Sequence, residues 1–73
     1  MNMKSRIIAV PTKELMDKLA EIYEAKGAKV VEVEGDIVAC FPSGYVIHVL
    51  VMPDIELNDP KRFLLSEAMN GTY

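Results

Sequence analysis

The sequence predicts a small α+β domain, a mixed four-stranded sheet with two helices in the order β-α-β-β-β-α. Three observations lead to this fold class. Residues 13–26 carry apolar side chains at helical spacing. Residues 29–52 hold three β-rich runs separated by two turn signals. Asp59-Pro60 then has the chemistry of a helix start. With 73 residues, the chain is predicted to form a single domain, residues 1–73.

The first two elements are a strand and the longer helix. Residues 6–10 form a β-rich run that ends at Pro11, and Thr12 is suited to cap a helix. One stripe of residues 13–26 is apolar and faces a core: Leu15, Met16, Leu19, Ala20, Ile22 and Tyr23. Gly27 follows, where a left-handed residue ends a helix.

Two hairpins are predicted next. In residues 29–34 valines alternate with glutamates, which predicts a half-buried strand with one wet face. Gly35 allows a tight turn into a strand over residues 37–41. Pro42-Ser43-Gly44 then predicts a three-residue loop before a strand over residues 45–52. Numbering the four predicted strands along the chain, we expect the spatial order 2-3-4-1.

The last helix is predicted to run from Pro60 to about Asn70, with Asp59 as its cap. Its apolar positions are Phe63, Leu64, Leu65, Ala68 and Met69. The order of elements resembles that of small mixed-sheet and ferredoxin-like folds, a likeness that carries no function.

The predicted sheet is too apolar for one of its faces to be left in water, because residues 45–52 are largely apolar on both sides. Two helices from so short a chain most economically cover one face. The other face then exposes the predicted interface residues, Val38, Cys40, Val46, His48 and Leu50, with parts of the first strand. Such a patch marks an interface, and the simplest partner is a second copy in a homodimer. The alternative is a monomer with a helix on each face.

Composition limits the remaining possibilities. A chain this short is marginally stable without help from packing or oligomerisation. Cys40 is the only cysteine, so no internal disulfide is expected, and Cys40 and His48 are too few ligands for a zinc site. No cofactor is predicted. The apolar run after the basic start is too short for a signal peptide, which predicts a cytoplasmic protein.

Two side chains on the second sheet face carry candidate chemistry. His48 is the only histidine, and it is interpreted as a general base, as a pH-sensitive contact or, more simply, as an ordinary interface residue. Cys40 beside it suggests a nucleophile, but a lone cysteine more often acts as a small hydrophobe.

Charged residues give two further candidates. Lys61 and Arg62 lie in the first turn of the last helix, where positive charge opposes the helix dipole, and are a candidate anion site. The alternative is that they pair with Glu56 or Asp59. The acidic side chains around the first hairpin turn, Glu32, Glu34 and Asp36, either contact a basic partner or simply solvate an edge strand.

Three functions remain open. The first is a non-enzymatic protein-interaction or regulatory module that works as a homodimer, with another protein as a further possible partner. The second is a small enzyme or ligand binder whose site lies between subunits and uses His48, Cys40 or Tyr45. The third is a weak nucleic-acid binder that uses Lys4, Arg6, Lys61 and Arg62. The net charge of −3 makes nucleic acid the least favoured partner, and no membrane partner is expected.

Overall fold

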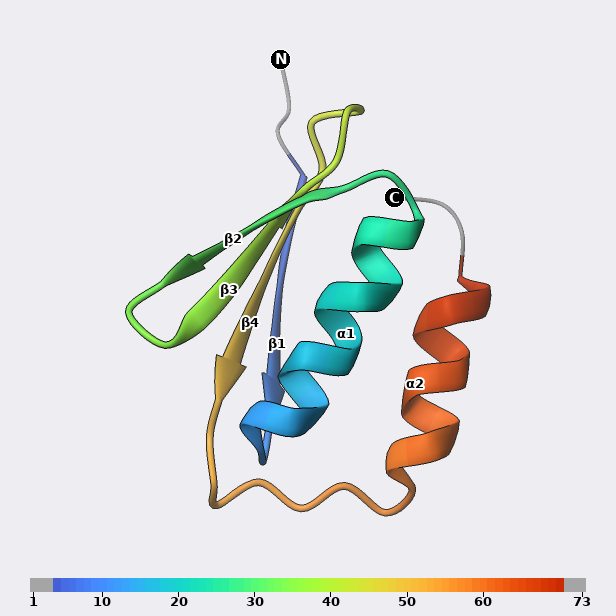
Figure 1. Cartoon of the computed structure of the whole chain (residues 1–73). Helices are drawn as coiled ribbons and strands as arrows, with labels where there is room; N and C mark the ends of the chain where they lie inside the picture. Colours follow the sequence, from blue (N-terminus) through green and yellow to red (C-terminus); the bar gives the residue numbers. More distant parts are fainter. Residues whose placement is uncertain (1–3, 71–73) are drawn as a thin grey trace.

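The computed structural model describes residues 4–70. Six elements follow one another in the predicted order: β1 (Ser5–Val10), α1 (Lys13–Ala25), β2 (Lys29–Val33), β3 (Asp36–Cys40), β4 (Val46–Val51) and α2 (Pro60–Met69). The predicted α+β class, with its mixed sheet and two helices, is confirmed (Figure 1).

The sheet has the strand order β1-β4-β3-β2. This is the predicted order 2-3-4-1, read from the opposite edge. β4 pairs in parallel with β1 and antiparallel with β3, and β3 pairs antiparallel with β2. The strand that is apolar on both sides therefore lies inside the sheet, where both of its edges are paired.

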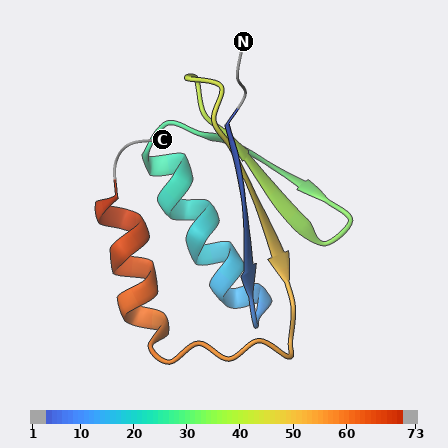
Figure 2. The ribbon, with the colours of Figure 1, turned by 180° about the vertical axis from the view of Figure 1, so that it is seen from behind.

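Both helices lie on the same side of the sheet. α1 packs across one sheet face, and α2 packs against α1 (Figure 1). Seen from behind, β1 passes in front of α1, and neither helix crosses to the near face of the sheet (Figure 2). The alternative with one helix on each face is therefore wrong for this chain.

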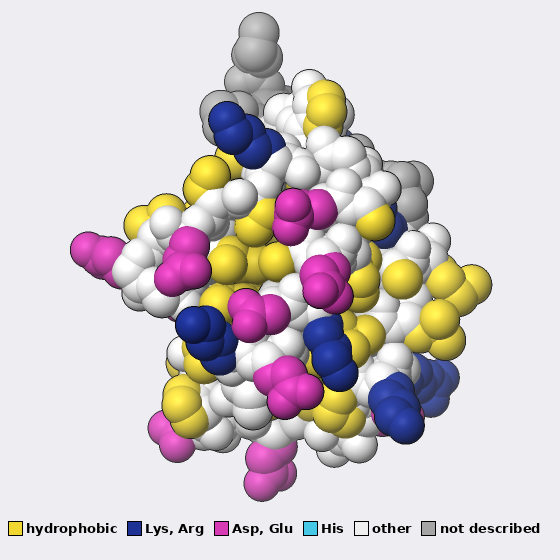
Figure 3. Space-filling model, viewed as in Figure 1, with side chains coloured by type: hydrophobic (Ala, Val, Ile, Leu, Met, Phe, Trp, Pro, Cys, Tyr) yellow, Lys and Arg dark blue, Asp and Glu magenta, His cyan; other side chains and the backbone are white. Residues whose placement is uncertain are grey.

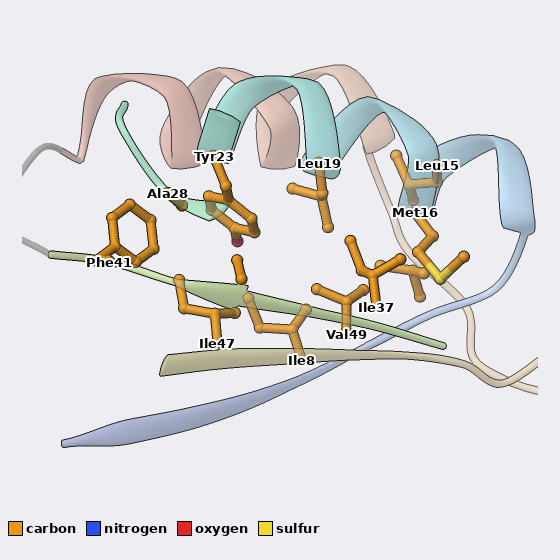
Figure 4. Close-up of a cluster of buried hydrophobic side chains, with 12 residues drawn as sticks. Ile8, Leu15, Met16, Leu19, Tyr23, Ala28, Ile37, Phe41, Ile47 and Val49 are labelled. Atoms are coloured by element: carbon orange, nitrogen blue, oxygen red, sulfur yellow. The ribbon is translucent and has the colours of Figure 1, made fainter. Parts of the chain in front are cut away.

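The core lies between α1 and the covered face of the sheet. Met16, Leu19 and Tyr23 of α1 point down onto the strands, and Leu15, also buried, lies beside the helix (Figure 4). All four belong to the predicted helical stripe. The strand residues that they meet are Ile8, Val10, Ile37, Ala39, Ile47 and Val49. The Thr12 hydroxyl accepts a hydrogen bond from the Leu15 amide at 3.2 Å, which confirms the cap.

The two hairpin turns also match their sequence signals. Glu34 and Gly35 both have positive φ, 50° and 86°, so they form a two-residue turn of the mirror-image kind that suits twisted strands. In the second loop Gly44 has a φ of 94°, and the amide of Phe41 donates to the Tyr45 carbonyl at 2.9 Å. That bond closes the three-residue loop.

The interior face of α2 differs from the prediction. Of the five apolar positions only Phe63 and Leu64 pack against the core, whereas Leu65 is 59% exposed and Met69 is 76% exposed. The one buried residue of α2 is Glu67, at 3% exposure. The reason is that α2 packs beside α1 rather than on the sheet, so only a narrow strip of the helix is covered.

The prediction for β2 also needs correction. Val31 and Val33 are exposed rather than buried, and Val30 is the β2 residue that packs against the core. β2 is an edge strand, and its valine face points away from the helices. The alternation was correct, but sequence alone could not say which face α1 would cover.

Candidate interaction surface

The sheet face opposite the helices is largely apolar and carries no covering element among residues 4–70. We call it the open face. It consists of alternate residues of the four strands: Ser5, Ile7, Ala9, Val46, His48, Leu50, Asp36, Val38, Cys40, Lys29, Val31 and Val33. The complementary set, such as Ile8, Ala39 and Val49, is buried under α1.

All five predicted interface residues lie on this face, on the two inner strands. Cys40 is exposed, and Val38, Val46, His48 and Leu50 are half-buried. The edge strands add apolar residues that sequence reasoning did not place there. Ile7 of β1 is 69% exposed, and Val31 and Val33 of β2 are also exposed. The signal for the valines was present in the apolar alternation of β2, but it was assigned to the covered face.

The pairing register arranges the open face in rows that run across the strands. The central row is Ile7, His48, Val38 and Val31, because His48 is opposite both Ile7 and Val38, and Val38 is opposite Val31. His48 thus lies in the middle of the sheet with aliphatic side chains on both neighbouring strands. On the helix side of the molecule no histidine is visible (Figure 3).

Charged residues on the open face lie on the two rows that flank the central one. Lys29 is opposite Cys40 on one of these rows, and Asp36 is opposite Val33 on the other. One oxygen of Asp36 accepts a hydrogen bond from the Val51 amide at 3.4 Å. The open face therefore has a positive end and a negative end near its β2–β3 edge, with an apolar row between them.

The fold brings together only some of the residues predicted for an enzyme or ligand-binding site between subunits. Cys40 and His48 share the open face on adjacent strands, two positions out of direct register. Tyr45, in contrast, packs against the core on the helix side, where its ring meets Phe41 edge-on at 6.4 Å between centroids. Tyr45 therefore cannot act with His48 and Cys40 on one surface.

Lys61 and Arg62 are exposed at the start of α2, but they border different hollows. Lys61 lines a groove of about 450 Å³ between the first turns of the two helices, with Lys18, Glu14 and Asp59 at its rim. Arg62 borders a separate hollow on the other side of Asp59. The Asp59 side chain accepts a hydrogen bond from the Arg62 amide at 3.2 Å, so a carboxylate already occupies this helix end. Anion binding by these residues stays a prediction.

The four cations of the nucleic-acid hypothesis do not converge. Lys4 precedes β1, whereas Lys61 lies in the first turn of α2, which starts at the opposite end of the molecule (Figure 1). Arg6 points to the helix side and forms an ion pair with Glu67, at 2.9 Å between Nη2 and Oε1. Electrostatic binding to phosphates requires several cations on one surface, which the geometry does not provide here.

A polar cluster that the sequence did not reveal joins α2 to the rest of the fold. The Tyr23 hydroxyl of α1 donates to Glu67 Oε2 at 3.2 Å, and Arg6 of β1 binds the other carboxylate oxygen. Lys26 at the end of α1 donates to the Asn70 carbonyl at the end of α2. A sequence signal existed, since Glu67 follows Phe63 by four residues and so lies on the inner strip of α2. Because both carboxylate oxygens of Glu67 have partners, we interpret the cluster as stabilising the packing of α2.

The acidic residues gather on the helix side of the molecule. Four of them run along the outer surface of α1: Glu14, Asp17, Glu21 and Glu24. Glu32 and Glu34 are exposed on the β2–β3 hairpin, and Figure 3 shows acidic side chains on both regions with hydrophobic surface between them. Asp36 belongs to the open face instead, so the three predicted edge acids do not form one surface.

Comparisons of this chain with protein-family models, with curated proteins and with solved structures found no match. Within residues 4–70 neither helix has the length and apolar character needed to cross a bilayer. The same residues contain no group of three or more His, Cys, Asp or Glu side chains arranged to hold a metal ion.

Proposed function

We propose that this protein is a non-enzymatic interaction module that works as a homodimer and associates through the open face. The observation that supports the proposal is the set of apolar side chains on all four strands of that face. Ile7, Val31 and Val33 are exposed on the two edge strands, and half-buried aliphatic residues fill the strands between them. A sheet face of this composition is normally covered.

The size of the open face is compatible with association of moderate strength. Four strands at about 4.8 Å spacing and six residues at about 3.3 Å each give a planar footprint of roughly 400 Å². Side chains standing out from the sheet enlarge the accessible area beyond this value. Two copies facing each other then lie near the lower end of specific interfaces, which bury about 1,200 to 2,000 Å² in total. We therefore expect a dissociation constant in the micromolar range.

The need for added stability also supports self-association. A domain of this length buries only about 60% of the surface that its unfolded chain exposes. The chain has no second cysteine with which to form an internal disulfide. Covering the open face adds apolar burial at about 25 cal/mol per Å² without lengthening the chain.

The test is the native mass across a dilution series, measured by light scattering after gel filtration. Wild-type protein is expected to pass from dimer to monomer through the micromolar range, whereas Ile7→Lys is expected to stay monomeric. Ile7 is 69% exposed, so a lysine is tolerated in the monomer but places a charge in the seam.

The matched control is Leu65→Lys. Leu65 is 59% exposed, on α2 and away from the open face. This variant is expected to dimerise like the wild type. A wild-type chain that remains monomeric at about millimolar concentration, or a Leu65→Lys variant that loses the dimer while Ile7→Lys keeps it, would contradict the proposal.

A further inference from the structure

The charges on the open face select one way of stacking two copies. In face-to-face packing a two-fold axis in the plane of the seam runs either along the strands or across them. An axis across the strands leaves each strand over its counterpart and exchanges the two ends of the face. Lys29 and Asp36 lie one row to either side of the central row. An axis along that row therefore brings each lysine to the level of the partner's aspartate, one strand away, because Lys29 is on β2 and Asp36 is on the neighbouring β3.

The other orientation offers no such match. An axis along the strands keeps each row at its own level and exchanges the two edges of the sheet. Lys29 then meets the row of Ser5 and Val46, which holds no acidic residue on the open face. Opposite charges across a seam fix orientation and register even where they add little affinity.

Resting on the homodimer proposed above, we infer that the two-fold axis runs along the row of Ile7, His48, Val38 and Val31. His48 then lies against the partner's His48, which makes the dimer sensitive to acid. Sheets pack about 10 Å apart, a separation that two imidazoles from facing strands span together. Two neutral imidazoles can share one hydrogen bond, because each ring has one donor and one acceptor nitrogen.

Protonation removes this contact and replaces it with two like charges in an apolar seam. Histidine is the side chain whose charge ordinarily changes between about pH 5 and pH 8. The monomer therefore binds more protons than the dimer at low pH. By linkage, association is strongest where both imidazoles are neutral, and it weakens progressively as the pH falls and they gain protons.

The charged and titratable groups near His48 on the open face all lie on the neighbouring rows. On β1 His48 faces Ile7, and on β3 it faces Val38. The nearest titratable groups on β3 are Cys40 and Asp36, each one row away. Asp36 binds the Val51 amide and, in this arrangement, the partner's Lys29, so its charge is offset rather than directed at the imidazole. Lys29 on β2 and its counterpart complete the charged groups of the face.

The test compares dimer dissociation constants of the untagged full chain by sedimentation at about pH 8 and about pH 5.5. With two imidazoles that must each lose a proton, the constant is expected to rise about 100-fold at the lower pH. His48→Leu and His48→Gln, neither of which titrates, are expected to dimerise equally at both values. Cys40→Ala is the control on the same face and is expected to keep the pH dependence.

Charge exchange tests the register independently. Lys29→Glu and Asp36→Lys are each expected to weaken the dimer about tenfold at neutral pH, and the double variant to recover most of the loss. Circular dichroism confirms that each variant is folded. A double variant no better than the worse single one would overturn the register.

The outcomes separate the two proposals. A wild-type monomer at both pH values would overturn the homodimer itself. A dimer whose dissociation constant is the same at both values would leave the homodimer standing and overturn the inference. If the dissociation constant still depends on pH in both His48 variants, the inference is also overturned, because another group then causes the effect.

Discussion

At the scale of single residues, Glu67 is the side chain whose role depends most on its neighbours. It is 3% exposed, yet it binds two partners from elements far apart in the sequence, Arg6 of β1 and Tyr23 of α1. Arg6 keeps 39% of its side chain exposed, so the ion pair borders water. A buried carboxylate costs free energy unless it is fully paired, and here the pairing fixes where α2 docks.

We expect Glu67→Gln to lower the free energy of unfolding by about 1 to 2 kcal/mol, because hydrogen bonds to a charged group are replaced by neutral ones. Urea denaturation followed by circular dichroism measures the change, under conditions where the oligomeric state is the same for both proteins. Glu24→Gln, at an exposed site on α1, is the control and is expected to differ from wild type by less than about 0.5 kcal/mol. Equal stabilities for the two variants would show that the cluster does not stabilise the fold.

At the scale of elements, the β2–β3 hairpin carries a local conflict between residue and conformation. Its two-residue turn requires positive φ at both positions, and Glu34 is the non-glycine residue of the described chain that adopts it, at 50°. Side chains with a Cβ atom pay for this conformation, whereas asparagine tolerates it and Asn-Gly is the preferred pair. The glutamate adds an exposed charge at the tip of an edge hairpin, which discourages edge-to-edge pairing.

Glu34→Asn is accordingly expected to stabilise the fold by about 0.5 to 1 kcal/mol, since the preferred residue relieves backbone strain in the turn. The measurement is the thermal or urea midpoint at matched protein concentration. Ser43→Asn, in the other hairpin loop and without positive φ, serves as control and is expected to leave the midpoint unchanged. A Glu34→Asn midpoint at or below that of wild type would contradict the strain argument.

At the scale of the whole molecule, the helices cover one face of the sheet and leave the open face uncovered. α1 and α2 share one face of the sheet, and the described chain has no third element for the other. In the proposed homodimer, folding and association are coupled, because anything that binds the native state and not the unfolded chain raises apparent stability. The open face is the surface through which dimerisation would raise the stability of the fold.

The melting temperature should therefore rise with protein concentration. In the range where the dimer predominates, a tenfold increase adds about 0.7 kcal/mol per subunit, or about 3 to 5 °C for a domain of this size. Scanning calorimetry across a concentration series measures the slope. Leu65→Lys should retain it and Ile7→Lys should lose it. A melting temperature independent of concentration in the wild type would speak against a folded dimer.

The sequence by itself determined the elements, their order and much of the candidate surface. The periodicity of apolar residues and the capping and turn residues were sufficient for this. The helical stripe of α1, the caps at Thr12 and Asp59, and the loop glycines at positions 35 and 44 all act locally. Apolar residues on both sides of β4 placed that strand inside the sheet and identified Val38, Val46 and Leu50 as surface needing a cover. Local signals of this kind can be recognised in the sequence because each one depends on a few neighbouring residues.

The tertiary structure decided which faces met. It put the valines of β2 outside, Glu67 inside, Tyr45 on the opposite side from His48, and Lys4 and Lys61 at opposite ends. None of these placements follows from periodicity, because an alternating strand or an amphipathic helix specifies two faces and not which of them is covered. That choice is made by long-range packing, as α1 can cover only part of the sheet and α2 must dock beside it. The same limit leaves His48 at the centre of a face that a second copy of the chain is expected to cover.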